Sequence, residues 1–208
     1  MTPWAAIVLA AGKGRRMGGP KALLMVDGQP LIHAHVQRLG EAGCEEIVVV
    51  TRQATAAAIG DMPGARVVCA DTDSMGASLR IALQNLAQSS ERVVLVAPVD
   101  TLPARCSTLR VLLMAAASEG TLVATPQHRG RSGHPIALRE QLLVPFREGF
   151  TGTLRDVVRS AGAQRRKVEV DDASVLVDLD TPADLAAQRP GFGPEFLLPR
   201  ADVVLAAG

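Results

Sequence analysis

Apolar and polar residues alternate in blocks along this chain, and the blocks predict strands and helices in turn. Short apolar runs rich in Val and Ile predict strands. They cover residues 4–9, 45–51, 65–70, 92–97, 121–125, 166–170 and 174–178. The run from Val93 to Val96 is apolar throughout, which is typical of a strand buried on both faces of a parallel sheet.

Helical spacing of apolar residues fills the segments between these strands. Pro30 begins one predicted helix, in which Ile32, Val36 and Leu39 share a face, and Gly43 lies beyond its end. The next two helices have the stripes Leu79, Ala82, Leu83, Leu86 and Leu109, Leu112, Leu113, Ala116. The alternation predicts an α/β fold, a three-layer α/β/α sandwich with a mostly parallel, Rossmann-like central sheet.

Two of these helices have candidate N-caps in the sequence. Ser107 or Thr108 is expected to cap the third helix, and Ser78 is a candidate cap for the second. Thr181 and Pro182 are the expected N-cap and first-turn proline of a terminal helix.

The chain length and the position of its structure-breaking residues predict the domain organisation. A chain of 208 residues can build one sizeable core. Residues 1–188 are therefore predicted to form one domain, because a Pro- and Gly-rich segment starts only at residue 189. Residues 189–208 are predicted to be a tail, either packed on the domain, docked on a partner chain or leading into a further domain.

Composition restricts the possible partners and the cellular compartment. The formal net charge of +1 and the 2% aromatic content give no reason to expect binding to nucleic acid or to a membrane. Cys44, Cys69 and Cys106 are too widely spaced to indicate a disulfide framework or a zinc site. The N-terminal apolar run is too short for a membrane span and lacks a basic start, so we expect a cytoplasmic protein.

The segment that follows the first predicted strand carries the strongest chemical signal. Residues 9–21 read LAAGKGRRMGGPK, and they combine uncluttered backbone amides with several fixed cations. Such a loop is suited to polyphosphate, because backbone N–H groups and basic side chains share the phosphate charge. The loop, residues 71–78 and Asp100 each follow a predicted strand, so we expect them at one edge of the sheet.

Two familiar phosphate-binding motifs fail on particular residues. A dinucleotide fingerprint needs a glycine where the chain has Met17, and an acidic residue where the second strand runs into Arg52. An ATPase P-loop needs Ser or Thr after Gly-Lys, whereas Lys13 is followed by Gly14.

The pattern Leu-Ala-Ala-Gly-x-x-x-Arg-Met-Gly, followed by Pro20-Lys21, resembles the signature loop of the MobA-like nucleotidyltransferases (NTP transferases). Val99-Asp100, Gly133-His134-Pro135 and residues 177–185 agree in the same order, so the resemblance covers about residues 4–188. Within the family, Ala10-Ala11-Gly12 is more similar to the molybdenum cofactor cytidylyltransferase type than to the guanylyl type.

The resemblance implies a nucleotide-diphospho-sugar transferase-like fold and an Mg²⁺-dependent transfer of a nucleotide, with release of pyrophosphate. The expected substrates are CTP and a phosphate-bearing acceptor. The expected acceptor is molybdopterin, and a sugar 1-phosphate is the alternative. The alternative hypothesis is a protein of another class. It would be a nucleotide- or cofactor-binding chaperone that does not catalyse turnover and that docks on a molybdoenzyme partner.

The resemblance also assigns roles to residues of this chain. Arg16 would hold the triphosphate, Lys21 would stabilise the transition state at the α-phosphate, and Asp100 would hold Mg²⁺. Asp180, with Asp178, would supply further carboxylates to the metal. The residues expected to bind the nucleotide are Ala10, Ala11, Gly12, Lys13, Gly14, Arg15, Arg16, Lys21 and Ser78.

The acceptor is expected to meet the basic loop that contains Arg131, Gly133, His134 and Pro135, for which a solvated hairpin is the alternative. Asp100 could instead cap a helix, and Asp178 could simply end a strand. His33 and His35 are interpreted as structural, because residues two apart on a helix do not share a face.

Overall fold

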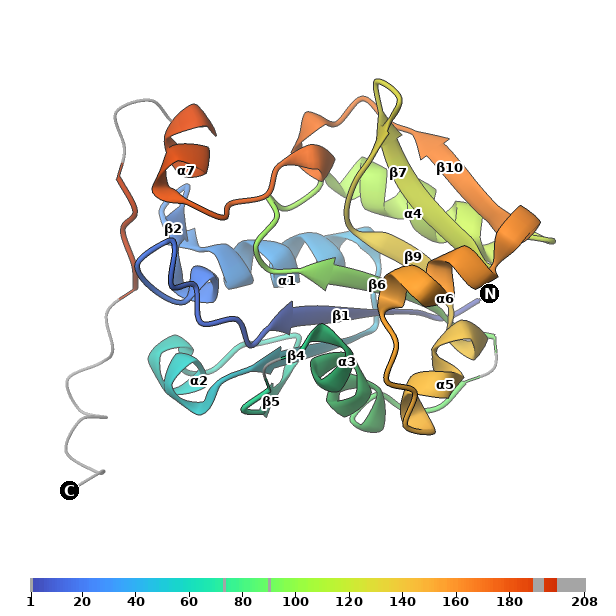
Figure 1. Ribbon diagram of the computed structural model, residues 1–208, viewed down its shortest axis with the longest axis horizontal. Coiled ribbons are helices and arrows are strands. Elements are labelled where there is room, and N and C mark those ends of the chain that lie inside the picture. Colours follow the sequence, from blue (N-terminus) through green and yellow to red (C-terminus); the bar gives the residue numbers. More distant parts are fainter. Residues whose placement is uncertain (1, 73, 90, 189–192, 198–208) are drawn as a thin grey trace.

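The computed structural model describes residues 2–72, 74–89, 91–188 and 193–197, and a mixed sheet lies at its centre (Figure 1). The strands of this sheet, in spatial order, are β10 (Arg165–Glu169), β7 (Val123–His128), β9 (Ile136–Arg139), β6 (Val93–Pro98), β1 (Trp4–Ala10), β4 (Glu46–Thr51) and β5 (Arg66–Cys69). A short strand, β8 (Arg131–Ser132), pairs with β7. A separate hairpin joins β2 (Met25–Val26) to β3 (Gln29–Pro30).

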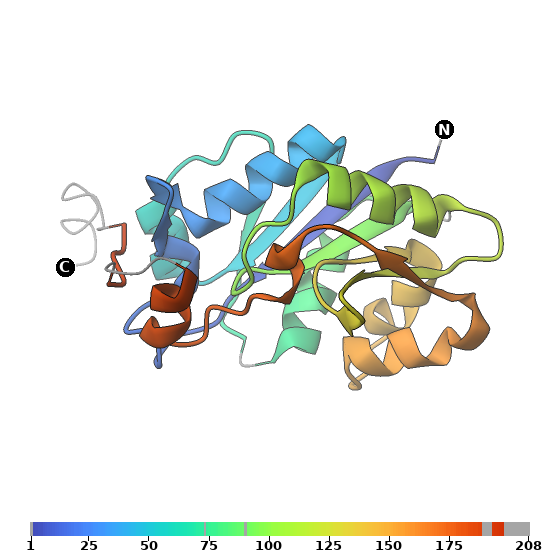
Figure 2. The same ribbon diagram turned by 90° about the horizontal axis from the view of Figure 1, so that it is seen from above.

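Helices cover both faces of the sheet, as Figure 2 shows. One face carries α1 (Leu31–Ala42), α2 (Gln53–Ile59) and α4 (Cys106–Ala117), which share one apolar core. The other face carries α3 (Met75–Gln84), α5 (Val144–Arg147) and α6 (Leu154–Ser160), which share a second. The predicted three-layer α/β/α fold is confirmed.

Short helical elements complete the chain. They are η1 (Lys21–Leu23), η2 (Glu140–Leu143), η3 (Gly162–Gln164), η4 (Ala173–Leu176) and α7 (Pro182–Gln188). Among the residues that the structure describes, no helix combines the length and the hydropathy needed to cross a membrane.

The central strands run parallel, and the departures from this pattern lie in the second half of the chain. β1 pairs in parallel with both β4 and β6, and its register places Val8 opposite Val49 on one side and Ala97 on the other. β9 is antiparallel to both of its neighbours and was not predicted. Its four residues follow Pro135 directly and are too few to show a periodicity.

The strand predicted at 174–178 is wrong, because most of this segment is the 3₁₀ helix η4. The side chain of Asp172 accepts a hydrogen bond from the backbone N–H of Ser174, which stabilises a helical turn here. Val175 is buried by packing rather than by strand pairing, so its apolar character mimicked a strand. Within the segment 174–178, Asp178 is the residue that pairs as a strand would, through an isolated bridge to Thr101.

The predicted caps of α3 and α4 are also wrong. Ser107 and Thr108 lie inside α4, whose N-cap is Arg105. The missing acceptor comes from a distant segment, since Asp172 Oδ2 accepts from Arg105 N and from Thr108 Oγ1, each at 2.8 Å. This pairing ties the segment before η4 to the start of α4.

Ser74, and not Ser78, caps α3 by accepting a hydrogen bond from the N–H of Ala77. The expected cap of the terminal helix is confirmed. Thr181 accepts from the N–H of Asp184, and the Asp184 carboxylate accepts from the N–H of Thr181 at 2.7 Å.

Candidate functional site

A cavity of about 380 Å³ opens where β1, β5 and β6 end. Ligands of open α/β sheets bind at this carboxyl edge, so the position agrees with the fold. The lining consists of the loop after β1, the loop before α3 and the residues after β6, together with one acid near the C-terminus. These residues are Leu9, Ala11, Gly12, Lys13, Gly14, Arg15, Arg16, Lys21, Arg52, Thr72, Ser74, Met75, Ser78, Pro98, Val99, Asp100 and Asp180.

The loop after β1 folds into a turn that only glycine permits at position 14. Gly14 has a φ of +59°, and a Cβ there would lie 1.9 Å from the carbonyl oxygen of Gly19. The Gly14 carbonyl accepts hydrogen bonds from the N–H groups of Met17 and Gly18. The Met17 side chain is fully buried and anchors the loop, while Arg16 remains on the surface.

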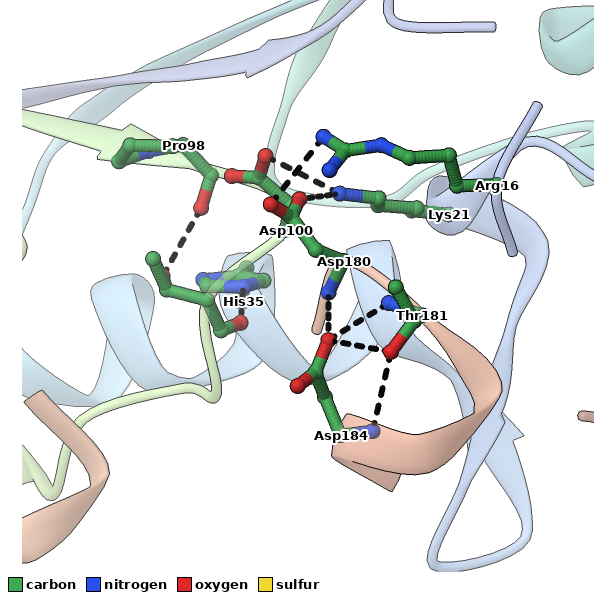
Figure 3. A network of polar contacts seen from close by, with 9 residues as sticks. Arg16, Lys21, His35, Pro98, Asp100, Asp180, Thr181 and Asp184 are labelled. Atoms are coloured by element: carbon green, nitrogen blue, oxygen red, sulfur yellow. Dashed lines mark hydrogen bonds and ion pairs between the residues drawn. The ribbon is translucent and has the colours of Figure 1, made fainter. Parts of the chain in front are cut away.

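Two cations and two carboxylates meet over this cavity (Figure 3). Lys21 Nζ lies 2.5 Å from Asp180 Oδ1 and 3.3 Å from Asp100 Oδ2, and Arg16 Nη2 lies 3.2 Å from Asp180 Oδ2. The hydrogen bond from Lys21 lowers the pKa of Asp180, and Arg16 adds to this effect. Lys21 is mostly covered, whereas both carboxylates remain about 40% exposed.

Backbone pairing brings the two carboxylate segments together from positions about 80 residues apart in the sequence. Thr101 and Asp178 form an antiparallel bridge, in which Leu102 N–H donates to Val177 O and Leu179 N–H donates to Asp100 O. The latter N···O distance is 2.6 Å. Asp100 lies six residues before α4 and does not cap it.

Asp178 and His134 lie behind this cluster and do not line the cavity. Burial raises the pKa of Asp178, and the neighbouring Asp100 and Asp180 raise it further, although His134 opposes them. Burial lowers the pKa of His134, whereas Asp178 and Asp100 act in the opposite direction. Within the described part of the chain, the buried Nδ1 of His134 has no hydrogen-bond partner.

The predicted acceptor loop has one exposed and one enclosed part. Arg131 lies exposed on β8, away from the cavity lining. Gly133 packs so closely on η4 that a Cβ would lie 1.8 Å from the Val175 carbonyl oxygen. The His134 N–H donates to that same carbonyl, and Pro135 follows through a cis peptide bond. The loop therefore abuts the segment that leads to Asp178.

The structure thus brings most of the predicted site residues together. Arg16, Lys21, Asp100 and Asp180 meet directly, and the loop residues 11–15 and Ser78 line the same cavity. Ala10 is buried in the core, and its carbonyl accepts from Thr51 Oγ1.

Sequence reasoning gave no role to Arg52, although its side chain lines the cavity. Its Nε donates to Ala11 O at 2.8 Å, Nη2 donates to Thr72 O at 3.0 Å, and Nη1 pairs with Asp71 at 2.6 Å. Arg52 therefore joins the loop after β1 to the loop before α3. Its position directly after β4, at the same sheet edge, was the available signal.

His35 was interpreted from the sequence as a structural residue. The structure shows in addition that it lies next to the site and supports it. The ring is buried in α1, and Nε2 donates a hydrogen bond to Thr101 O at 2.9 Å, next to Asp100 (Figure 3). Burial lowers the pKa of His35 to about 4, so the ring is neutral at physiological pH. No pattern in the sequence pairs α1 with this loop.

Among the described residues, no group of three or more His, Cys, Asp or Glu side chains is arranged to hold a metal ion by itself. Asp100 and Asp180 are nevertheless oxygen donors that face a cavity, which is what a Mg²⁺ or Mn²⁺ ion shared with phosphate oxygens requires.

The family model of the MobA-like NTP transferase domain matches residues 6–168 of this chain. The chain belongs to this family. The predicted family is confirmed, and with it the prediction that the protein is a nucleotidyltransferase.

Two relatives match nearly the whole chain, and both are named molybdenum cofactor guanylyltransferase. The chain is 30% identical over 196 residues to a molybdenum cofactor guanylyltransferase of Xanthomonas euvesicatoria, covering 86% of this chain and 91% of the relative. It is 30% identical over 200 residues to the molybdenum cofactor guanylyltransferase of Pseudomonas aeruginosa, covering 91% and 96%.

A solved structure supports the fold independently. The manganese complex of Rv0371C from Mycobacterium tuberculosis superposes with a TM-score of 0.74 at 23% identity, covering 89% of this chain and 97% of that chain. The cytidylyl type predicted from Ala10-Ala11-Gly12 has no counterpart in the names of the two relatives above, which are guanylyltransferases.

Proposed function

We propose that this nucleotidyltransferase transfers a nucleoside monophosphate from a nucleoside triphosphate to molybdopterin, and that the cavity at the carboxyl edge is its active site. The observation that carries the proposal is Lys21, a mostly covered cation held between Asp100 and Asp180 at the cavity wall. An acceptor phosphate oxygen attacks the α-phosphorus, the bond to the bridging oxygen breaks, and pyrophosphate leaves. Such an acceptor is already anionic, so charge and alignment set the barrier.

The chain's own groups divide this work. The amides of the loop around Gly12 and Gly14, with Arg16, bind the triphosphate. Lys21 neutralises the charge that develops at the α-phosphate, because it is fixed before the reaction by two carboxylates rather than by water. Arg16 is the more exposed cation and is suited to the outer phosphates.

Asp100 and Asp180 are the groups that would hold a divalent cation, Mg²⁺ by proposal. A bound cation would polarise phosphate oxygens and fix their orientation. Two carboxylates fit this need, because Mg²⁺ takes one or two carboxylates and fills its other positions with water and substrate oxygens. Asp178 has a raised pKa and lies outside the cavity lining, so we assign it a supporting role.

The names of the relatives favour GTP as the donor, whereas the Ala-Ala-Gly signature favours CTP. We propose GTP, because the similarity to these relatives covers 86% and 91% of the chain, whereas the signature is a three-residue segment. Molybdopterin is proposed as the acceptor on the same names and on the position of His134, which lies near enough to Asp178 and Asp100 to be affected by their charge.

The test is pyrophosphate release with GTP, CTP, ATP and UTP in turn, with Mg²⁺ or Mn²⁺, and with molybdopterin, a sugar 1-phosphate or no acceptor. Release with GTP and molybdopterin alone would support the proposal in full. Release with CTP would overturn the choice of base, and release only with a sugar 1-phosphate would overturn the acceptor. Nucleotide binding without release under any condition would favour the chaperone hypothesis.

A further inference from the structure

Residues 193–197, near the C-terminus, pair with residues 23–25, which closely follow Lys21. Met25 N–H donates to Glu195 O at 2.7 Å, and Leu197 N–H donates to Leu23 O at 2.8 Å. Leu24 and Phe196 form the antiparallel bridge between these bonds. Figure 1 shows this segment, in dark red, beside β2. The segment is thus held by an isolated bridge and two backbone hydrogen bonds next to the turn that carries Lys21.

The Phe196 ring packs against the phosphate-binding loop itself. A Cβ on Gly19 would lie 3.1 Å from two ring carbons of Phe196, so the ring is in close contact with the loop backbone. The ring also packs against a small apolar cluster that is separate from the two main cores. This cluster contains Met17, Leu24, Val26, Leu31, Leu179 and Leu185.

The members of this cluster flank both partners of the central ion pair. Met17 and Leu24 lie four residues before and three residues after Lys21, and Leu179 directly precedes Asp180. The cluster is therefore the packed base on which Lys21 and Asp180 are brought to 2.5 Å from each other. Phe196 packs against its rim, because it contacts the loop as well as the cluster.

We infer that residues 193–197, acting through Phe196, are a positioning element of the nucleotidyl-transfer site. The inference rests on the proposed function and extends the site to a segment beyond the matched family domain, which ends at residue 168. Phe196 does not touch the cavity; it fixes the loop backbone from behind. A displacement of about 1 Å at a reacting group can reduce a rate by up to about 100-fold, so loss of such a support is measurable.

The test compares Phe196→Ala with Phe196→Leu and with Val157→Ala in the full chain. Val157 is a buried residue of α6 in the core on the other face of the sheet. Its truncation removes fewer atoms than that of Phe196 and controls for loss of apolar packing remote from the site. Each variant is assayed for pyrophosphate release at a temperature where thermal melting shows it folded. Amide hydrogen exchange of residues 14–26 and 154–160 is measured in parallel.

We expect kcat of Phe196→Ala to fall about 10-fold relative to Val157→Ala, with KM for the nucleotide changed less than about 3-fold. Phe196→Leu should recover most of the rate. Amides of residues 14–26 should exchange faster in Phe196→Ala, while those of 154–160 should not change.

Equal rates for Phe196→Ala and Val157→Ala, or unchanged exchange across residues 14–26, would overturn the inference. Absence of turnover in the wild-type chain with every nucleotide would contradict the proposed function instead. In that case the exchange of residues 14–26 alone decides whether Phe196 positions the loop.

Discussion

Two groups of four charged side chains, each with two cations and two carboxylates, lie at opposite edges of the same sheet. The carboxyl-edge group is Arg16, Lys21, Asp100 and Asp180. The amino-edge group is Arg92, Arg147, Glu46 and Glu140. Glu46 begins β4, Arg92 precedes β6, Glu140 follows β9, and Arg147 ends α5. Their charges are equal in number, and their surroundings differ.

The amino-edge group is largely covered by the protein, and among the described residues Glu140 Oε2 has an ion-pair partner but no hydrogen bond. The Glu140 side chain is 4% exposed and lies 2.7 Å from Arg147 Nη2 and 3.8 Å from Arg92 Nε. The backbone carbonyls of Leu83 and Ala87 accept further hydrogen bonds from these arginines. Charges with so many protein partners hold segments together, and breaking such a set leaves a buried charge uncompensated.

The carboxyl-edge group is open to its cavity. The Arg16 side chain is 73% exposed, and Asp180 is 39% exposed. Lys21 is 13% exposed, but both of its carboxylate partners reach solvent. Ion pairs with exposed partners contribute little to stability, so a phosphate or a cation can replace a partner at small cost. The comparison teaches that solvent access, rather than the number of ion pairs, separates the functional cluster from the structural one.

The largest effect is expected from Asp100→Asn. The amide is isosteric but carries no charge, so it should abolish turnover that depends on a divalent cation. The measurement is pyrophosphate release across a Mg²⁺ and Mn²⁺ titration, with a chelator-treated wild type as the reference. Wild-type rates at ordinary metal concentration would place the metal elsewhere.

Lys21→Ala comes next. It should lower kcat by about 100-fold or more, with a much smaller change in nucleotide affinity, because the fixed charge acts in the transition state. Its free energy of unfolding should change little, since both partner carboxylates reach solvent. Steady-state kinetics, nucleotide titration and thermal melting together check this. Weaker binding with unchanged kcat would contradict the role given to Lys21.

At the opposite edge, Glu140→Ala should reverse this pattern. The substitution leaves Arg147 without its carboxylate and is expected to cost about 3 kcal/mol of the free energy of unfolding. For a chain of this size that corresponds to a fall in Tm of roughly 6–12 °C. Glu140→Gln, which keeps a hydrogen-bond acceptor, is the control and should lose less. If Glu140→Ala lowers kcat at temperatures where the variant is folded, the amino-edge group also affects catalysis, and the separation of the two groups is contradicted.

The smallest effect concerns His35, which lies beneath the carboxyl-edge group but is buried. Its pKa of about 4 in the folded protein lies below the usual 6.5, so the unfolded chain binds more protons between these values. Wild-type stability should therefore fall as pH decreases through this window, by about 2 kcal/mol at pH 5.

His35→Gln keeps a donor for the Thr101 carbonyl and cannot titrate, so it should lack this acid-dependent loss. The measurement is the difference in unfolding free energy between the two proteins from pH 7 to pH 4. A difference that does not vary with pH would show that the buried imidazole is not the source.

The sequence predicted the parts of the fold that local patterns specify. β1, β4, β5 and β6 form continuous apolar runs, and Pro30 and Gly43 bound α1 as expected. The segment at 174–178 and the cap of α4 were both mispredicted, and both depend on Asp172. Its bond to Ser174 is local, but the apolar residues that follow resemble a strand. Its bonds to Arg105 and Thr108, at the start of α4, span 64–67 residues. Such partners are set by tertiary packing and leave no local signal.

The candidate site shows the same division. The loop from Gly12 to Lys21 was predictable, because its glycines and cations are contiguous in the sequence. The contact of Lys21 with Asp180 spans 159 residues and was not predicted. Only the family resemblance placed both residues in one site. Arg52, His35 and Phe196 carried no motif, since each acts on the backbone of another segment.

The most direct test of the account measures pyrophosphate release by wild type, Lys21→Ala and Glu140→Ala side by side, at one temperature where all three are folded. The account predicts that Lys21→Ala loses about 100-fold or more in kcat at near-normal stability, whereas Glu140→Ala turns over like wild type despite its lower Tm. Turnover retained by Lys21→Ala, or lost equally by both variants, would contradict the assignment of the carboxyl-edge cluster as the catalytic one.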